Sequence, residues 1–163
     1  MTARRSLALA LFLVWLAPLS AAAAGWGGIT PGESDIDSVR GLYGAPSREQ
    51  RQKEEGYDTL LWIYEREKAP RGFVKMEVSF GLLTANGYRP RLVRYLRLEP
   101  RPGIFTQQTV LTGWGAKRTV GKEKNHPVFF YKDHGLVVYF DEKEVNAVSM
   151  MFTLPQPDTP PSR

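Results

Sequence analysis

The sequence predicts an α+β fold of two tandem αβββ units, an antiparallel sheet with short helices packed on one face. Two observations lead to this prediction. A helix-like motif occurs twice at a constant offset, and three strand-like runs follow each copy with no helix between them. Strands that follow one another directly must pair antiparallel, which leaves the helices to cover the sheet. The first unit is expected over residues 25–100 and the second over residues 101–153.

The chain opens with the pattern of a secretory signal peptide, expected over residues 1–24. Arg4 and Arg5 supply positive charge, residues 7–17 form an unbroken apolar run, and four alanines at 21–24 offer small side chains for cleavage. This run is too short for a spanning helix, which needs about 20 residues, so it argues against a retained membrane anchor. Cleavage after any of the last three alanines fits the pattern, and we expect it after Ala24.

The sequence contains no cysteine, so the fold is held by packing without disulfides. No lipid-anchor cysteine follows the predicted signal either. We therefore expect a periplasmic or secreted protein that does not span the membrane after cleavage. Removing Arg4 and Arg5 lowers the formal net charge from +5 to +3. So mild a charge, in a secreted protein, argues against a nucleic-acid partner.

The repeated motif predicts two short helices. Pro31, Asp35, Val39, Tyr43 and Gly44 of the first copy correspond to Pro102, Thr106, Val110, Trp114 and Gly115 of the second. In the first copy this register makes Asp35 the N-cap. The alternative is Ser34, with Asp37 three residues later completing a capping box. In the second copy Thr106 is the expected cap, and Gly115 suits the residue after the helix.

Three strand-like runs follow each predicted helix. In the first unit they lie at residues 59–64, 73–80 and 91–98, and in the second at 128–131, 136–140 and 145–152. The run at 73–80 alternates apolar and polar residues, the period of a half-buried strand.

Two segments fall outside this repeat. Residues 47–56 are highly charged without an apolar stripe, and we expect a solvated loop or the frayed end of a helix. Residues 154–163 contain four prolines and are expected to form a disordered tail.

The first copy resembles a family pattern. The matching residues are Ile29 to Ser34, Val39, Leu42 to Pro46, and the strand Trp62-Ile63-Tyr64. This pattern is similar to the SmpA/OmlA group of BamE-type small envelope proteins, and to the related tandem-repeat fold of β-lactamase inhibitor proteins. One extra residue separates Ser34 from Val39, so Asp35 takes the family's cap position. The second copy matches only loosely.

The resemblance implies a non-catalytic module that binds another protein, because members of these groups act as envelope assembly factors or protein inhibitors. The chain lacks the lipidated cysteine of the assembly factors and the disulfides of the inhibitors. For this reason neither group's partner transfers to it.

The residues themselves give no support for catalysis or for a cofactor. No cysteine nucleophile, nucleophile elbow or phosphate-binding glycine loop is present. His126 and His134, with Asp133 or Asp141, could bind zinc, but their spacing favours exposed loop histidines. We expect no enzyme activity, no metal and no cofactor.

The third run of the first unit is rich in arginine. Arg89, Arg91, Arg94, Arg97 and Arg101 fall within thirteen residues and are opposed by Glu99 alone. Leu61 and Ile63 suit the buried face of the preceding strand, which would leave Trp62 and Tyr64 exposed on the other. We therefore predict a partner-binding patch on the open sheet face. Its residues are Trp62, Tyr64, Arg91, Tyr95 and Arg97. The alternative is a solvated strand face on which arginine stems cover apolar surface.

Two functions fit such a patch. The first is a cell-envelope protein-binding or assembly module. The second is a binder of an anionic envelope component, such as a lipid headgroup or a cell-wall polymer. High salt should weaken the second more than the first. A hydrolase would need His126 or His134 and is disfavoured.

Overall fold

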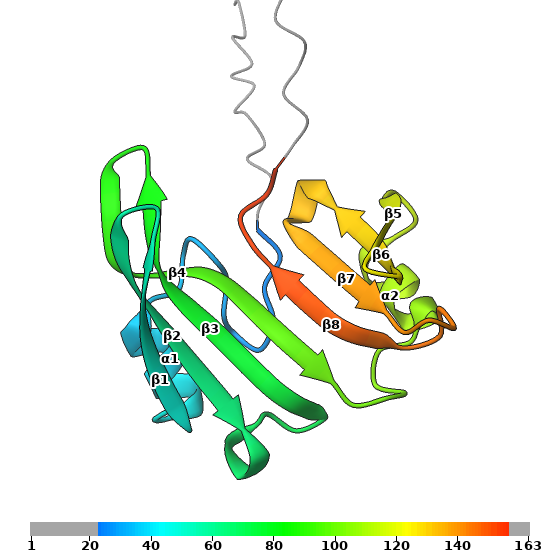
Figure 1. Ribbon diagram of the computed structural model, residues 1–163, viewed down its shortest axis with the longest axis horizontal. Helices are drawn as coiled ribbons and strands as arrows, with labels where there is room; N and C mark the ends of the chain where they lie inside the picture. The colour runs from blue at the N-terminus through cyan, green and yellow to red at the C-terminus, as the bar shows by residue number, and fades with distance from the viewer. Residues whose placement is uncertain (1–22, 157–163) are drawn as a thin grey trace, which may run out of the picture.

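One eight-stranded antiparallel sheet dominates the computed structural model, which describes residues 23–156 (Figure 1). Its strands lie in the order β1-β2-β3-β4-β8-β7-β6-β5. They are β1 (Arg48–Glu54), β2 (Tyr57–Glu65), β3 (Phe73–Thr84), β4 (Gly87–Pro100), β5 (Thr119–Glu123), β6 (His126–Tyr131), β7 (Leu136–Phe140) and β8 (Ala147–Phe152). The α-helices are α1 (Ile36–Tyr43) and α2 (Gln107–Trp114), and the 3-10 turns are η1 (Arg66–Lys68) and η2 (Lys132–His134).

Two successive groups of strands meet in the middle of the sheet. The strands β1 to β4 form one half as a meander, and β5 to β8 form the other. The halves join where β4 pairs antiparallel with β8. The paired residues are Leu96 with Phe152, Arg97 with Met151, and Leu98 with Met150. This short β4–β8 junction places residues about fifty positions apart in the sequence side by side.

The predicted fold class is wrong. The chain was expected to form an α+β arrangement of two tandem αβββ units with helices packed on one face. It forms instead a single sheet of eight strands with only two short helices. The repeat pattern described local segments, whereas the pairing of β4 with β8 depends on contacts that no local pattern encodes.

The charged segment at residues 47–56 contains a strand, so the prediction of a loop or a frayed helix end is also wrong. β1 lies at one edge of the sheet and β5 at the other. Seven consecutive polar residues make up β1. An edge strand faces water along its outer side, and charges there prevent pairing with other chains. Because β1 buries little, it lacks the apolar period by which strands are found in sequence.

The predicted helix caps are confirmed. The Asp35 carboxylate accepts a hydrogen bond from the Ser38 amide at 2.9 Å, and the Asp35 amide donates to the Ser38 hydroxyl at 2.8 Å, which completes a capping box. Ser34, the alternative cap, instead accepts from the Thr30 amide. At α2 the Thr106 hydroxyl accepts from the Thr109 amide at 3.2 Å.

Most of the core lies on one face of the sheet, which we call the core face. It carries Trp62 and Tyr64 of β2, Val78 of β3, Leu98 of β4 and Met150 of β8, all buried. In Figure 1 α1 lies behind β1 and β2, on this side. Ring contacts run along the core face from one half to the other. They join Tyr43 to Trp26, Trp26 to Phe73, Phe73 to Phe105, Phe105 to Trp114, and Trp114 to Phe152.

The two ends of the described chain pack near each other. The Ala24 amide donates to the His134 carbonyl at 2.8 Å, and the Gln156 amide donates to the Lys132 carbonyl at 2.9 Å. The predicted signal up to residue 22 and the predicted tail from residue 157 lie outside the described residues. Within residues 23–156, no helix is both long enough and apolar enough to cross a membrane.

Candidate functional site

Trp62 and Tyr64 do not lie on the open face. Their exposed fractions are 1% and 0%, because β2 turns both side chains to the core face. The Trp62 indole donates to Glu49 at 3.0 Å, and the guanidinium of Arg40 lies 5.1 Å from its ring. The placement expected from the sequence is therefore wrong. The reason is that β2 is an inner strand with apolar residues of both parities. Leu61 and Ile63 are buried as expected, at 7% and 3% exposed, and Trp62 and Tyr64 are buried as well.

Arg91 is also separate from the open face. Its guanidinium forms an ion pair with Asp37 of α1 at 2.5 Å, so it reaches toward the helix side of the sheet. Both side chains are largely exposed. The contact joins β4 to α1 on the helix side of the sheet.

Tyr95 and Arg97 do lie together on the face opposite the core, which we call the open face. Tyr95 pairs with Ser79 of β3, and Arg97 pairs with Glu77. All four side chains therefore lie on the same face of the sheet. Of the five residues predicted to form the patch, the structure brings only these two together.

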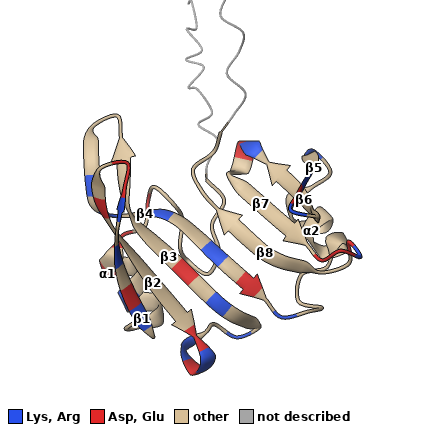
Figure 2. Cartoon of the chain, in the orientation of Figure 1, with Lys and Arg blue, Asp and Glu red and all other residues tan. Residues whose placement is uncertain are grey.

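A chain of charges crosses the open face from the end of β4 to Arg97. The Lys75 ammonium lies 2.7 Å from Glu99 and 3.0 Å from Glu77. The hydrogen bond to Glu99 is the main cause of the raised pKa of Lys75. Glu77 is in turn 3.9 Å from Nη1 of Arg97, a distance too long for a hydrogen bond. Figure 2 shows these acidic and basic positions along β3 and β4.

Arg97 stands at the centre of the open face with unused donors. It pairs with Met151 at the β4–β8 junction, and its side chain is 42% exposed. Its Nε atom is buried, yet it has no hydrogen-bond partner in the described part of the chain. Protein atoms cover Nε, so an outside acceptor can reach only the Nη end of this half-exposed side chain.

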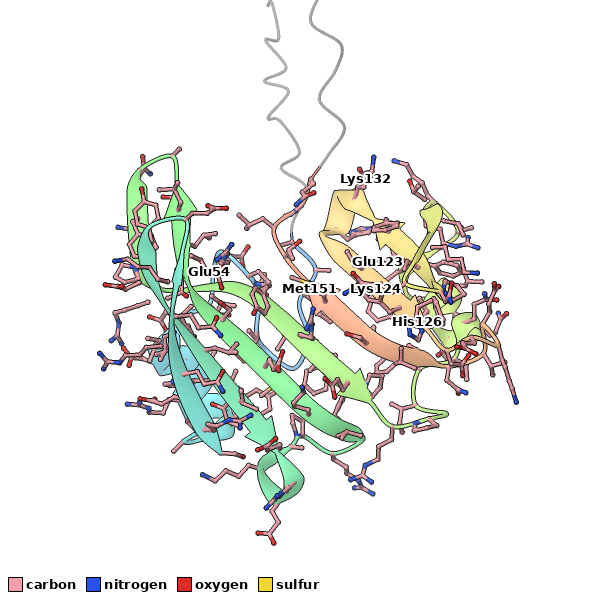
Figure 3. The ribbon with its side chains drawn as sticks, in the orientation of Figure 1. Glu54, Glu123, Lys124, His126, Lys132 and Met151 are labelled. Atoms are coloured by element: carbon pink, nitrogen blue, oxygen red, sulfur yellow. The ribbon has the colours of Figure 1, made fainter. Side chains whose placement is uncertain are left out.

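Arg97 lines two hollows. The His126 hollow has a volume of about 320 Å³ and is lined by Arg97, Glu99, Glu123, Lys124, His126, Tyr139, Val148 and Ser149. The Met151 hollow has a volume of about 490 Å³ and is lined by Glu54, Leu82, Arg94, Tyr95, Arg97, Met151, Thr153, Leu154 and Gln156. In the view of Figure 3, Met151 lies between Glu54 and the group formed by Glu123, Lys124 and His126.

The acidic groups of both hollows already have partners. In the His126 hollow, Glu123 accepts from the Tyr139 hydroxyl at 3.0 Å. Burial, and then this hydrogen bond, raise the pKa of Tyr139. In the Met151 hollow, Glu54 is paired with Arg94. Glu54 is thus neutralised by Arg94, whereas Glu123 keeps its charge, and the one ion-pair partner of Arg97 among residues 23–156 is Glu77 at 3.9 Å.

Neither histidine belongs to a metal-binding cluster in the described part of the chain. Nδ1 of His126 lies 3.0 Å from the Phe140 carbonyl, and the Asp133 carboxylate next to His134 is bound to Lys117 at 2.6 Å. Among the described residues, no group of three or more His, Asp or Glu side chains is placed to hold a metal ion.

A third hollow, of about 230 Å³, lies at the end of α2 and is lined in part by Arg118. Here too the arginine Nε is buried without a partner in the described chain. However, the Arg118 guanidinium stacks over Phe129 at 4.1 Å, and its Nη1 donates to the Ala116 carbonyl at 3.0 Å. These contacts use the cation to cover the core, so we regard Arg97 as the stronger candidate.

Several residues of the site were not found from the sequence. Met151, Tyr139, Glu123 and Glu54 come from four strands, and only the sheet order brings them around Arg97. The one available signal was the excess of arginine in β4, which pointed to the correct strand.

Comparison with known proteins shows no family for this chain. No protein-family model matches the sequence, and no curated protein matches it. One similar solved structure is a DUF4309 family protein, YjgB, from Bacillus subtilis subsp. subtilis str. 168. The TM-score is 0.49 at 12% identity, over 78% of this chain and 82% of that one. Another is an extracellular protein containing an SCP domain from Bacillus anthracis str. Ames. Here the TM-score is 0.43 at 13% identity, over 74% of this chain and 43% of that one.

The resemblance to the SmpA/OmlA group is contradicted: no family model matches the chain, and nothing in the comparisons points to a BamE-type protein. The quoted motif consists of a capped helix and an inner strand, features that unrelated sheet proteins share. Both TM-scores are below 0.5, so neither neighbour bears on function.

Proposed function

We propose that this chain is a non-catalytic protein-binding module of the cell envelope, which binds its partner through the open face around Arg97. The observation that carries this proposal is the position of Arg97. It lines both hollows, its side chain is 42% exposed, and it lies at the junction of the two halves. Arginine is enriched at the energetic centres of protein interfaces.

The extent of the surface favours a protein over a small molecule. The residues of the two hollows run from Glu54 on β1 to Glu123 on β5, and so extend from one edge strand of the sheet to the other. A stable protein interface needs about 800 Å² on each partner, which calls for a broad surface of this kind. Tyr95, Tyr139 and Met151 supply the aromatic and methionine side chains common in such interfaces.

The alternative function, binding of an anionic lipid or polymer through the arginine-rich strand, has less support. Such binding needs several cations on one surface. Arg91 is paired with Asp37 on the helix side, and Arg94 is paired with Glu54 on the open face. The arginines of β4 are therefore divided between the two faces, and two of them are already neutralised. For this reason we propose the protein-binding function alone.

The envelope location rests on the predicted signal peptide, and the absence of catalysis rests on the sequence.

Photo-crosslinking in the native host tests the proposal. A photoreactive phenylalanine analogue replaces Met151 on the open face, and the control replaces Leu42 of α1, which is 53% exposed on the opposite side. We expect a discrete heavier adduct at Met151 and none at Leu42. Circular dichroism of both purified variants confirms folding. Equal adducts at both positions, or none at Met151 in a folded variant, would contradict binding through the open face.

A further inference from the structure

The chemistry of the partner can be inferred from Arg97, given the proposed function on which this step rests. A guanidinium carries five N–H donors in a planar fork that matches a carboxylate. On the open face, Glu77 is the carboxylate nearest to Arg97 in the described chain, and at 3.9 Å it is too distant to satisfy Nη1. Nε is covered by protein atoms, so the donors open to an outside carboxylate are those at the Nη end of the half-exposed side chain.

The neighbours of Glu77 explain why its carboxylate does not come within hydrogen-bond distance of Arg97. Glu77 is 14% exposed and is held by Lys75 at 3.0 Å, and Lys75 is held by Glu99 at 2.7 Å. These contacts draw the Glu77 carboxylate away from Arg97 and along β3. Glu77 is therefore paired with Lys75, and the Nη donors of Arg97 are left for an external ligand.

The charges that line the His126 hollow are balanced, with Arg97 and Lys124 opposite Glu99 and Glu123. Glu99 is paired with Lys75, and Glu123 accepts from Tyr139. Lys124, in the turn before β6, forms no ion pair among residues 23–156 and lines the same hollow as Arg97. The two cations thus balance the two acids of this hollow, and the attraction for an incoming carboxylate comes from the Arg97 guanidinium itself.

The Met151 hollow, on the other side of Arg97, has a different character. Its lining includes the apolar surfaces of Leu82, Tyr95, Met151 and Leu154. Its one acid, Glu54, is paired with Arg94. This hollow suits an aromatic or aliphatic side chain, and methionine adapts its shape to such a group.

We infer that the partner protein presents an acidic side chain next to an apolar one, with the carboxylate on the Arg97 guanidinium and the apolar side chain in the Met151 hollow. The two hollows share Arg97, so neighbouring residues of one partner segment can fill both. The acid gives direction through paired hydrogen bonds, and the apolar neighbour excludes water from them.

Nuclear magnetic resonance of the Arg97 Nε–H group tests this inference on the purified full chain. The probes are N-acetyl-Phe-Asp-amide, its Asn counterpart and inorganic phosphate. The Nε–H signal is assigned by its loss in Arg97→Gln. We expect the Asp peptide to shift this signal saturably and at least about tenfold more tightly than the Asn peptide, since charged hydrogen bonds contribute about that much. Arg97→Lys should retain part of the affinity, measured in this variant from the backbone amide signals of β4 and β8.

Matched variants locate the site. Arg89→Gln removes an exposed arginine from the same strand, outside both hollows, and should leave the Asp peptide affinity unchanged. Met151→Ser should weaken the binding of the Phe-Asp peptide but not the binding of N-acetyl-Asp-amide. Thermal unfolding shows that each variant is folded. Equal affinity for the Asp and Asn peptides, or tighter binding of phosphate than of either, would overturn the inference. The phosphate result would favour an anionic polymer or headgroup.

The crosslinking experiment tests the proposed interface, and the resonance experiment tests the carboxylate ligand, so either claim can be overturned without the other. An adduct at Met151 without an Arg97 shift would keep the open face as the interface but overturn the acidic ligand. A specific Arg97 shift without any adduct would keep the carboxylate site and overturn the proposed docking of a protein.

Discussion

The phenol of Tyr64 is fully buried, with its hydroxyl donating to the Gly44 carbonyl at the end of α1 at 3.0 Å. The pKa of Tyr64 is raised to about 12, mainly by the burial of its phenol, and the nearby positive charge of Arg40 opposes this shift in part. Burial also raises the pKa of Tyr43, whose ring contacts Tyr64. The neutral phenol is therefore the form that fits the folded state.

Tyr64 makes the protein sensitive to alkali. An unfolded tyrosine ionises near pH 10, so the stability that Tyr64 contributes is complete below about pH 10 and is lost as the pH rises toward 12. In Tyr64→Phe, the urea midpoint should fall less between pH 9 and 11.5 than in the wild type. The same change at the exposed Tyr57 is the control and should keep the wild-type slope. Equal slopes for Tyr64→Phe and the wild type would contradict this account.

At the scale of elements, the two α-helices are capped by different chemistry. Each has eight residues, too short to be stable alone, so the caps and the packing of Val39 and Val110 maintain them. At α1 the cap is a carboxylate, and the hydrogen bond from the Ser38 amide is the main cause of the lowered pKa of Asp35. At α2 the cap is the neutral Thr106 hydroxyl.

This difference predicts a difference in pH dependence. Asp35→Ala should lower the urea midpoint at pH 7, and its effect should fade as the pH drops below 3.8 and through the lower pKa of folded Asp35. Thr106→Ala should cost about 1 kcal/mol at every pH. The midpoints are measured from pH 2.5 to 7. A pH-independent loss in Asp35→Ala would show that its charge does not contribute to the cap.

At the scale of the whole molecule, two features hold the halves together. On the sheet itself, three residue pairs join β4 to β8. On the core face, ring contacts run from Trp26 through Phe73, Phe105 and Trp114. Both halves bury their apolar side chains in the same cluster, so neither has a core of its own.

We therefore expect the described domain to unfold as one unit. Leu98→Ala, a buried site at the β4–β8 junction, should cost about 2–5 kcal/mol and destabilise both halves equally. Hydrogen exchange of amides in β2 and β7 measures each half. Leu83→Ala, at an exposed position of β3, should stay within about 0.5 kcal/mol of the wild type. Earlier exchange in β7 than in β2 after Leu98→Ala would show that the halves unfold independently.

The sequence by itself determined the features that depend on neighbouring residues. The caps at Asp35 and Thr106 follow from hydrogen bonds that span three residues, and the alternation in β3 follows from the period of a strand. The excess of arginine in β4 identified the strand that carries Arg97. Each of these signals lies within about fifteen residues.

Only the tertiary structure decided the rest, because it depends on pairing between distant strands. The parity of β2, which buries Trp62, is set by its neighbours β1 and β3. Ion pairs to α1 and β1 remove Arg91 and Arg94 from the free cations of the strand. The β4–β8 junction brings Met151 beside Arg97 and gives the arginine its two hollows. A local pattern records which side chains a strand carries, whereas the sheet order decides which of them are buried, paired or left to bind.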